Sequence, residues 1–261
     1  MDLNIAGRTA LVFGAGGGLG GAIARALAAE GVKVAAADIA LAPARDTVAD
    51  IEAAGGTALA VGWDIGDLGV AAENLDRVRA ALGEVAILVN MTGGPPPSTA
   101  AGVPTEVWTS HFQSMVAGVI GVTDLVLPAM RAAGWGRIIT STSSGVIAPI
   151  PNLGVSNALR AALVGWSKTL AGEVGRDGIT ANVILPGRIA TGRITQLDEA
   201  RAQREGRTVD DVQQASTATI PLGRYGRPDE YGAAATFLAG EGASYITGSV
   251  IRVDGGLIPS I

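Results

Sequence analysis

The sequence predicts an α/β protein with a single domain, built on a doubly wound, mostly parallel sheet of seven strands. Short apolar segments alternate with longer helical stretches along the chain, and this alternation is typical of strand–helix–strand units with right-handed crossovers. The apolar segments are continuous, as expected of parallel strands that are covered on both faces. The 261 residues, 48% of them hydrophobic and 16% charged, suit one sizeable core.

The apolar periodicity places the strands and helices in a regular order. Strands are expected at residues 9–13, 32–37, 58–62, 85–89, 137–141, 180–185 and 249–253. Helices are expected between them, at about 19–30, 42–54, 68–82, 105–133, 154–175 and 228–239. In the helix at 154–175, spacings of three and four residues give one apolar stripe, formed by Leu159, Leu163, Trp166 and Leu170.

Two segments interrupt this alternation. Residues 93–98 follow the fourth strand and contain three prolines in a row, which exclude a helix or a central strand. Residues 192–227 are more polar than their surroundings, and the stretch from Thr208 to Asp211 is typical of a helix start. We expect 192–227 to be a helical excursion over the carboxyl edge of the sheet, where it would form a lid.

Composition excludes several kinds of site and partner. The chain has no cysteine, which excludes disulfides, thiolate catalysis and cysteine-ligated metals, and a single histidine, His111, which excludes a His-rich metal site. We therefore expect no metal. The net charge of −5 and the lack of a basic run argue against nucleic acid or an anionic membrane as a partner.

The N-terminal residues lack the basic and apolar regions of a signal peptide. The apolar runs are interrupted well short of the roughly 20 residues that are needed to span a bilayer. We expect a soluble cytoplasmic protein that acts on a small molecule.

A glycine-rich turn, Phe-Gly-Ala-Gly-Gly-Gly-Leu-Gly at residues 13–20, joins the first strand to the first helix. Glycines allow a tight turn and a close approach of the backbone to a pyrophosphate, whose charge the helix N-terminus stabilises. The turn therefore predicts a dinucleotide site. The alternative is a merely tight strand–helix connection, because in so glycine-rich a stretch Gly16, Gly18 and Gly21 also satisfy G-x-G-x-x-G by chance.

An acidic residue, Asp38, ends the second strand, 24 residues beyond Gly14. A carboxylate there can accept hydrogen bonds from the hydroxyls of an adenosine ribose and would repel a 2′-phosphate. The neighbours that could carry a compensating arginine, Ala15, Gly17 and Ile39, are not basic. The sequence therefore favours NAD(H) over NADP(H) as the cofactor, with a solvated strand-end carboxylate as the alternative.

Further motifs make the chain resemble the short-chain dehydrogenase/reductase family, from about residue 5 to residue 257. They are the turn of Gly14, Gly18 and Gly20 (with Phe13 where the family has threonine), Trp63-Asp64-Ile65, Asn90-Met91-Thr92-Gly93, Pro186 to Thr191, Tyr245 to Gly248 and Val253 to Gly256. The resemblance implies a Rossmann fold and a homodimer or homotetramer formed through the helices at 105–133 and 154–175. It implies NAD contacts by Gly14, Gly18, Leu19, Gly20, Asp38, Asp64, Ile65, Asn90, Gly93, Pro186, Gly187, Ile189 and Thr191.

The chain departs from the family at its catalytic residues, which are usually Asn, Ser, Tyr and Lys. Ser143 falls at the serine position, but Ser156 stands where the tyrosine is expected, Arg160 where the lysine is expected, and Met115 at the asparagine position. The downstream motifs fix this alignment. A branch of the family labelled as 3-oxoacyl-[acyl-carrier-protein] reductases has a similar Ser-Asn-x-x-Arg and Gly-Gly-Pro-Pro-Pro.

These replacements change the acid–base chemistry. A phenol has a pKa near 10 and an aliphatic hydroxyl a far higher one, close to that of water, so the serine anion costs roughly 7–8 kcal/mol more to form. Arg160 can hold a ribose hydroxyl or a carboxylate, but it does not lose its proton usefully. Three alternatives stay open: a water relay through Ser143, Ser156 and the ribose, another titrating side chain from the lid or the 93–103 loop, or a substrate that needs little acid–base help.

Other side chains are weaker candidates. His111 can titrate near neutral pH and lies about one turn before Met115, although a structural role is the simpler interpretation. Arg188 adjoins the expected nicotinamide loop, where it could bind a substrate carboxylate or stay solvated. Tyr225 and Tyr245 lie in stretches that resemble structural segments of the family, and we expect Lys168 at the surface.

Three functions therefore remain after the sequence alone. The first is an NAD(H)-dependent oxidoreductase acting on a hydroxyl or carbonyl substrate with an atypical proton path, for which Ser143, Ser156 and Arg160 are the candidate catalytic residues. The second is a non-redox lyase or isomerase that uses the same pocket. The third is a catalytically silent NAD-binding protein.

Overall fold

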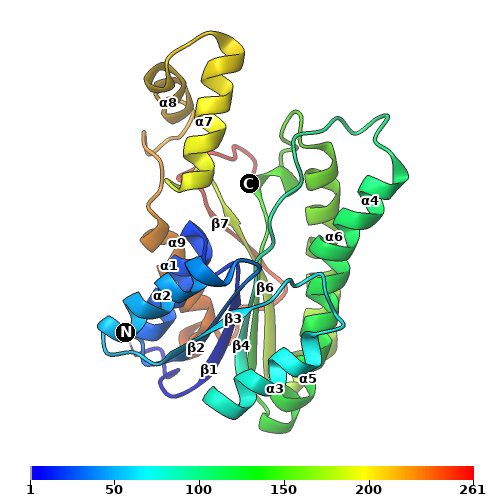
Figure 1. Cartoon of the computed structure of the whole chain (residues 1–261), viewed down its shortest axis with the longest axis vertical. Coiled ribbons are helices and arrows are strands. Elements are labelled where there is room, and N and C mark those ends of the chain that lie inside the picture. The colour runs from blue at the N-terminus through cyan, green and yellow to red at the C-terminus, as the bar shows by residue number, and fades with distance from the viewer. Residues whose placement is uncertain (1) are drawn as a thin grey trace.

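Seven parallel strands form one sheet at the centre of the molecule, in a computed structural model that describes residues 2–261 (Figure 1). The order across the sheet is β3-β2-β1-β4-β5-β6-β7, and every neighbouring pair is parallel. The strands are β1 (Thr9–Phe13), β2 (Lys33–Asp38), β3 (Ala58–Gly62), β4 (Val85–Asn90), β5 (Gly136–Ser141), β6 (Ile179–Pro186) and β7 (Val250–Val253). The order reverses between β1 and β4, which is the point where doubly wound sheets bind ligands at their carboxyl edge.

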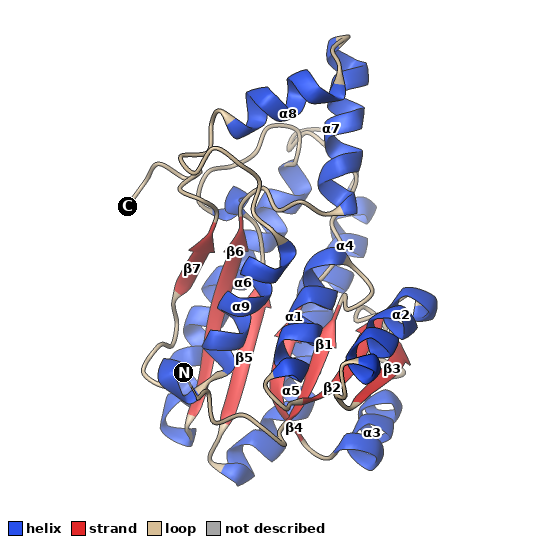
Figure 2. Ribbon diagram, turned by 90° about the vertical axis from the view of Figure 1, so that its left-hand side faces the viewer, coloured by secondary structure: helices blue, strands red, loops and turns tan. Residues whose placement is uncertain are grey.

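Helices cover both faces of the sheet, as Figure 2 shows. The first face carries α1 (Gly18–Ala29), α2 (Leu41–Ala53) and α9 (Pro228–Ala239). The second face carries α3 (Ala71–Leu82), α4 (Thr105–Phe112), α5 (Gly118–Ala133) and α6 (Gly154–Val174). Two further helices, α7 (Gly192–Glu205) and α8 (Val209–Thr217), lie beyond the carboxyl ends of the strands.

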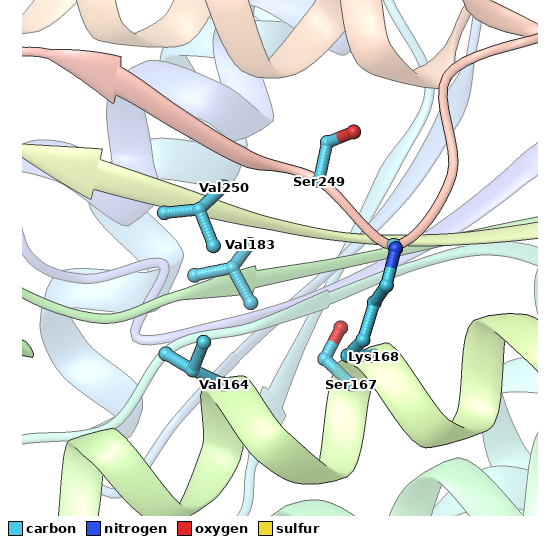
Figure 3. A pocket seen from close by; sticks show the side chains of 7 residues that line it. Val164, Ser167, Lys168, Val183, Ser249 and Val250 are labelled. Atoms are coloured by element: carbon cyan, nitrogen blue, oxygen red, sulfur yellow. The ribbon is translucent and has the colours of Figure 1, made fainter. Parts of the chain in front are cut away.

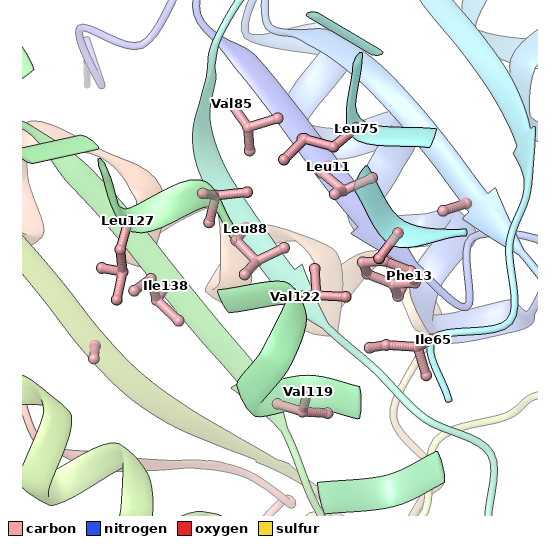
Figure 4. Packing of buried hydrophobic residues seen from close by; sticks show 14 of the residues in the cluster. Leu11, Phe13, Ile65, Leu75, Val85, Leu88, Val119, Val122, Leu127 and Ile138 are labelled. Atoms are coloured by element: carbon pink, nitrogen blue, oxygen red, sulfur yellow. The ribbon is translucent and has the colours of Figure 1, made fainter. Parts of the chain in front are cut away.

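Two apolar layers, one on each side of the sheet, make up most of the core. Along β1, Ala10 and Val12 face α1 and α9, whereas Leu11 and Phe13 face the other side, because successive side chains of a strand point in opposite directions. Figure 4 shows the second layer, in which Leu11, Phe13 and Leu88 meet side chains from α3 and α5. Both faces are buried, which is why the strands are continuously apolar.

The predicted fold class, strands and helices are confirmed, with shifts at a few ends. The helix expected from residue 68 begins at Ala71, because Asp64 and Asp67 each accept a hydrogen bond from the backbone amide two residues on and hold that stretch in turns. The expected helix start at Thr208 is confirmed: its side chain and that of Asp211 form a reciprocal cap on α8.

The helix expected at 105–133 contains one feature that the sequence did not indicate. A π-helical turn at Gln113–Ala117 separates α4 from α5, and Met115 is buried within it. The whole helix is long and apolar enough to cross a bilayer by length and composition, but half of its most apolar window is buried inside the protein. Its apolar side chains pack on the sheet through residues such as Val119 and Val122.

A buried polar pair ties α9 to β5. The hydroxyl of Tyr231, which is completely buried, lies 2.7 Å from Oγ of Ser141 and donates to the carbonyl of Ile184 at 3.2 Å. Burial raises the pKa of Tyr231, so the phenol is neutral at physiological pH and serves as a hydrogen-bonding group in the core.

This pair gives a stability prediction. Tyr231→Phe leaves the buried Ser141 hydroxyl without its partner, so we expect the free energy of unfolding to fall by about 1–3 kcal/mol in denaturant titrations. The double variant Tyr231→Phe/Ser141→Ala should lose less than the sum of the two single variants. Tyr245→Phe, at a fully exposed tyrosine, is the control and should change nothing; an equal loss there would contradict the assignment.

Candidate active site

The glycine turn after β1 has a backbone that only glycine allows at two positions. Gly14 has a φ of 65°, in the left-handed region. A Cβ on Gly20 would overlap the carbonyl oxygen of Gly14, so α1 can start this close to β1 only with glycine there. The turn is closed by the amide of Gly17, which donates to the carbonyl of Gly14 at 3.0 Å.

The first turn of α1 presents backbone amides toward the carboxyl edge. Its first intrahelical bond runs from the Gly21 amide to the Gly17 carbonyl, so the amides of Gly18, Leu19 and Gly20 come before any helical acceptor, and no side chain caps them. Such a helix start attracts a phosphate by its free N–H groups and its dipole. This backbone fits the pyrophosphate of a dinucleotide.

The carboxylate of Asp38 lies directly beside the glycine turn. Its Oδ2 accepts a hydrogen bond from the amide of Gly16, and its Oδ1 accepts one from the amide of Ala40, both at 3.0 Å. Its neighbour Ile39 points outward and is 74% exposed. The structure thus brings together two features that lie more than 20 residues apart in the chain, the turn and the strand-end carboxylate.

The residues after β3 and β4 form the next part of the same edge. Asp64 is exposed and its Oδ1 accepts from the amide of Gly66 at 2.9 Å, whereas the side chain of Ile65 is buried in the core. Asn90 is fully buried, and its Nδ2 donates to Oγ1 of Thr123 at 3.3 Å. Its side chain therefore ties β4 to α5.

Several buried polar atoms at this edge have no hydrogen-bond partner among residues 2–261. They cluster where β4 and β5 end: Oδ1 of Asn90 and the hydroxyls of Thr92, Thr140 and Thr142. Buried polar atoms are normally paired, so such a group marks a place where a ligand or ordered water completes the hydrogen bonding. A nicotinamide dinucleotide fits this surface as well as the glycine turn.

The loop after β6 reaches back to the glycine turn. A Cβ on Gly187 would lie 2.5 Å from Cα of Asp254, so this residue must be glycine for the loop to pass β7, beside Pro186. Ile189 is buried and pairs with Gly226 as an isolated bridge. Thr191 ends the loop next to Gly18, whose Cβ would lie 2.7 Å from Cγ2 of Thr191. The predicted nicotinamide and pyrophosphate contacts are therefore neighbours.

The three candidate catalytic residues lie on two elements at this edge. Ser143 follows β5, and its Oγ accepts a hydrogen bond from the amide of Gly145 at 3.1 Å. Ser156 and Arg160 lie one turn apart on α6, and Nε of Arg160 donates to Oγ of Ser156 at 3.3 Å. Each serine oxygen thus accepts one bond in the protein and keeps its own O–H for another acceptor.

Arg160 also fastens the loop that contains Gly93. Its Nη2 donates to the carbonyl oxygens of Thr92 and Gly93, at 3.2 and 3.0 Å. The side chain is only 9% exposed. Burial lowers the pKa of Arg160 to about 10, an effect that Tyr231 opposes and that the charge of Arg193 reinforces, so the guanidinium stays charged at neutral pH.

A buried carboxylate, Asp198, joins the helix α7 to the segments that follow β6 and precede α9. Its Oδ1 accepts from Nη1 of Arg188 at 2.9 Å and its Oδ2 from the hydroxyl of Tyr225 at 2.8 Å, and the residue is 1% exposed. Burial, followed by the hydrogen bond to Asp198, raises the pKa of Tyr225. Arg188 is thus paired within the protein rather than solvated, and its contact with a substrate carboxylate stays a prediction. The sequence did not indicate a buried role for Asp198, because the segment around it is polar and is typical of an exposed surface.

The weaker candidates have no hydrogen bond to the three candidate catalytic residues in the described part of the chain. Among residues 2–261, no hydrogen bond joins the half-buried His111 to Ser143, Ser156 or Arg160. Met115 belongs to the apolar core, and Tyr245 is fully exposed. Lys168 is exposed, as expected, and lines a pocket of about 210 Å³ between α6 and the edge strand β7 (Figure 3).

The parallel sheet, the glycine turn and the acidic end of β2 define a dinucleotide-binding protein of the Rossmann class. A family model described as "Enoyl-(Acyl carrier protein) reductase" matches residues 14–258. The 3-oxoacyl-[acyl-carrier-protein] reductase of Escherichia coli is 36% identical over 257 residues, 98% of this chain and 99% of that protein. The chain belongs to the short-chain dehydrogenase/reductase family, a family of oxidoreductases that use a nicotinamide dinucleotide and a small-molecule substrate.

Solved structures agree with this assignment. The L-sorbose reductase of Gluconobacter frateurii, in complex with NADPH and L-sorbose, has a TM-score of 0.94 and 29% identity, with both chains fully covered. A 7α-hydroxysteroid dehydrogenase in complex with NADH and 7-oxo glycochenodeoxycholic acid has a TM-score of 0.89 and 29% identity, with 98% of this chain and 96% of that chain covered. Similar proteins thus include complexes with each of the two coenzymes.

The pairing of Asp198 gives a prediction about the lid. Asp198→Ala leaves the Arg188 guanidinium and the Tyr225 hydroxyl without their acceptor, so we expect α7 and α8 to exchange backbone amide hydrogens faster and the protein to lose about 1–3 kcal/mol of stability. Hydrogen-exchange mass spectrometry measures the first effect and denaturant titration the second. The control is Asp210→Ala, an exposed carboxylate on α8. Unchanged exchange in α7 for Asp198→Ala would contradict the role of this contact.

Proposed function

We propose that this protein is an NAD(H)-dependent dehydrogenase/reductase that interconverts a carbonyl and a hydroxyl group through an atypical proton path. The observation that carries the proposal is the hydrogen bond between the Gly16 amide and Asp38, which lies beside the first-turn amides of α1. The same edge of the sheet carries Ser143, Ser156 and Arg160. A dinucleotide held by the glycine turn and Asp38 would extend along this edge toward the two serines and Arg160.

Asp38 supports NAD(H) as the preferred cofactor. Its carboxylate can accept the ribose hydroxyls of the adenosine half and would repel a 2′-phosphate. The neighbouring Ile39 and the turn residues Ala15 and Gly17 offer no positive charge to offset that repulsion. In the proposed complex, Gly14, Gly18, Leu19 and Gly20 surround the pyrophosphate, Asp64 and Ile65 lie toward the adenine, and Asn90, Gly93, Pro186, Gly187, Ile189 and Thr191 lie toward the nicotinamide.

The hydroxyls of Ser143 and Ser156 supply the proton path in this proposal. The bound nicotinamide supplies or accepts the hydride. Ser143 donates its O–H to the substrate oxygen, and Ser156, whose oxygen already accepts from Arg160, passes a proton from water. A free serine anion is too costly, so each hydroxyl gives and takes a proton in the same step, as a relay does. Arg160 stabilises the negative charge that develops on the oxygens.

The lack of a phenol or imidazole hydrogen-bonded to Ser143, Ser156 or Arg160, among residues 2–261, favours a second candidate. It is a non-redox lyase or isomerase, or a silent protein that only binds NAD. A screen of alcohols and ketones separates these functions. Net oxidation or reduction of the coenzyme supports the oxidoreductase, product without net coenzyme change supports the lyase or isomerase, and binding without turnover favours the silent protein.

We further propose a cytoplasmic homodimer or homotetramer, assembled through the α4–α5 helix and α6 as in the family it belongs to. The polar helices α7 and α8 stand over the carboxyl edge, and we propose that they act as a lid on the substrate.

The cofactor preference is tested by titrating NADH and NADPH by fluorescence. We expect the wild-type protein to bind NADH more tightly. Asp38→Ala should weaken NADH binding by about tenfold to a hundredfold and improve NADPH relative to it, because a charge-assisted hydrogen bond is lost and the repulsion of the phosphate is removed. Asp46→Ala, at an exposed carboxylate of α2, is the control. If Asp38→Ala leaves the NADH/NADPH ratio unchanged, the assignment of NAD(H) is wrong.

The proton path is tested by removing each hydroxyl. Ser143→Ala should lower kcat/KM by about a hundredfold to a thousandfold, as for the loss of one donor to a developing oxyanion, while the Kd for NADH stays unchanged. Ser156→Ala should have a smaller effect of about tenfold, because water can replace one member of a relay. Ser144→Ala is the neighbouring control. Full activity of Ser143→Ala would overturn this path without affecting the cofactor site.

A further inference from the structure

The guanidinium of Arg160 is buried without a counter-ion. The side chain is 9% exposed, and none of the ion pairs within residues 2–261 includes it. Its hydrogen-bond acceptors are neutral: one serine hydroxyl and two backbone carbonyls. Arg193, at the start of α7, has the same sign of charge and lowers the pKa of Arg160 further. A buried charge normally has a partner, because desolvation is costly.

The chain provides partners for its other shielded arginines. Arg137, which is 2% exposed, donates to Glu241 at 3.4 Å and lies over the ring of Trp135. Arg188 is paired with Asp198. The difference at Arg160 is therefore specific to the place where the candidate catalytic serines meet.

The hydrogen bonds of Arg160 leave one part of the guanidinium free. Its Nε–H is directed to Ser156, and the two N–H groups of Nη2 are directed to the carbonyls of Thr92 and Gly93. A guanidinium has five N–H groups, so the two on Nη1 are left, and they have no acceptor among residues 2–261. They lie at the carboxyl edge, on the same side chain that bonds to Ser156.

We infer that the substrate of this site carries a carboxylate that pairs with Nη1 of Arg160. The inference rests on the proposed function and names its substrate class: a short oxo acid, reduced to the corresponding hydroxy acid. The carbonyl carbon gains the hydride, the carbonyl oxygen gains the proton that the serines relay, and the carboxylate is unchanged. This carboxylate is the counter-ion that Arg160 lacks. Arg160 then binds one end of a short substrate, and Ser143 binds the carbonyl oxygen at the other.

A carboxylate fits this place better than other anions. One nitrogen with two N–H groups suits a monoanion, whereas a phosphate dianion needs more donors than Nη1 offers. The pyrophosphate of the cofactor has a separate set of donors, the first-turn amides of α1. The exposed Arg193, whose charge acts on Arg160, raises the local concentration of anions.

Binding of matched ligands tests the inference without turnover. Calorimetry with NADH-saturated protein should show that butyrate binds about tenfold to a hundredfold more tightly than butyramide, because only the acid forms a charge-assisted bond. Arg160→Gln should abolish this preference, and Arg160→Lys should keep part of it. Arg176→Gln, at an exposed arginine beyond the far end of α6, is the control and should keep all of it. If Arg160→Gln does not fold, the ratio of the affinities of the wild-type protein for butyrate and butyramide tests the inference.

Turnover gives the second test, with pyruvate, 3-oxobutanoate and 4-oxopentanoate compared with their methyl esters. At least one acid should exceed its ester tenfold or more in kcat/KM, and this ratio should collapse in Arg160→Gln. Equal binding of butyrate and butyramide, or equal rates for all acids and esters, overturns the inference but leaves the oxidoreductase proposal standing. If Arg160→Gln weakens the binding of NADH as much as it weakens the binding of butyrate, the anion that pairs with Arg160 belongs to the cofactor. That result also overturns the inference. A protein that does not bind NADH at all contradicts the proposed function itself.

Discussion

The candidate site depends on one short contact, the hydrogen bond from the Gly16 amide to the carboxylate of Asp38. It fixes the end of β2 to the glycine turn and so sets where the Asp38 carboxylate lies relative to the amides of α1. Both features lie at the point where the strand order reverses, between β1 and β4. Because β1 is central and buried on both faces, the turn has little freedom, and the loops after β4, β5 and β6 are built around it.

Around this fixed cradle, the chain combines neutral hydroxyls with a buried positive charge. Ser143 and Ser156 carry hydroxyls there, and Arg160 holds the loop at Thr92 and Gly93. The guanidinium thus has a structural role through Nε and Nη2. A buried cation discriminates charged from neutral ligands more strongly than a hydroxyl does.

The sequence predicted the sheet, the glycine turn and the carboxylate that ends β2, because all three depend on local patterns. Continuous apolar runs identify parallel strands, and the glycines of the turn with Asp38 lie at fixed offsets from them. It did not predict Asp198, whose burial comes from Arg188 and Tyr225 approaching from other parts of the chain, nor the core position of Tyr231. It also gave no sign of the π-helical turn around Met115.

By itself, then, the sequence determined the fold class, the order of strands and helices, the dinucleotide turn and the family of this protein. These features follow from the short-range periodicity of apolar residues and from the spacing of motif residues, both of which are properties of the local sequence. Only the tertiary structure decided which charges are paired. Arg188 is neutralised by a residue of α7, whereas Arg160 has no counter-ion among residues 2–261, because the partner of a side chain depends on which distant elements the sheet brings to its edge.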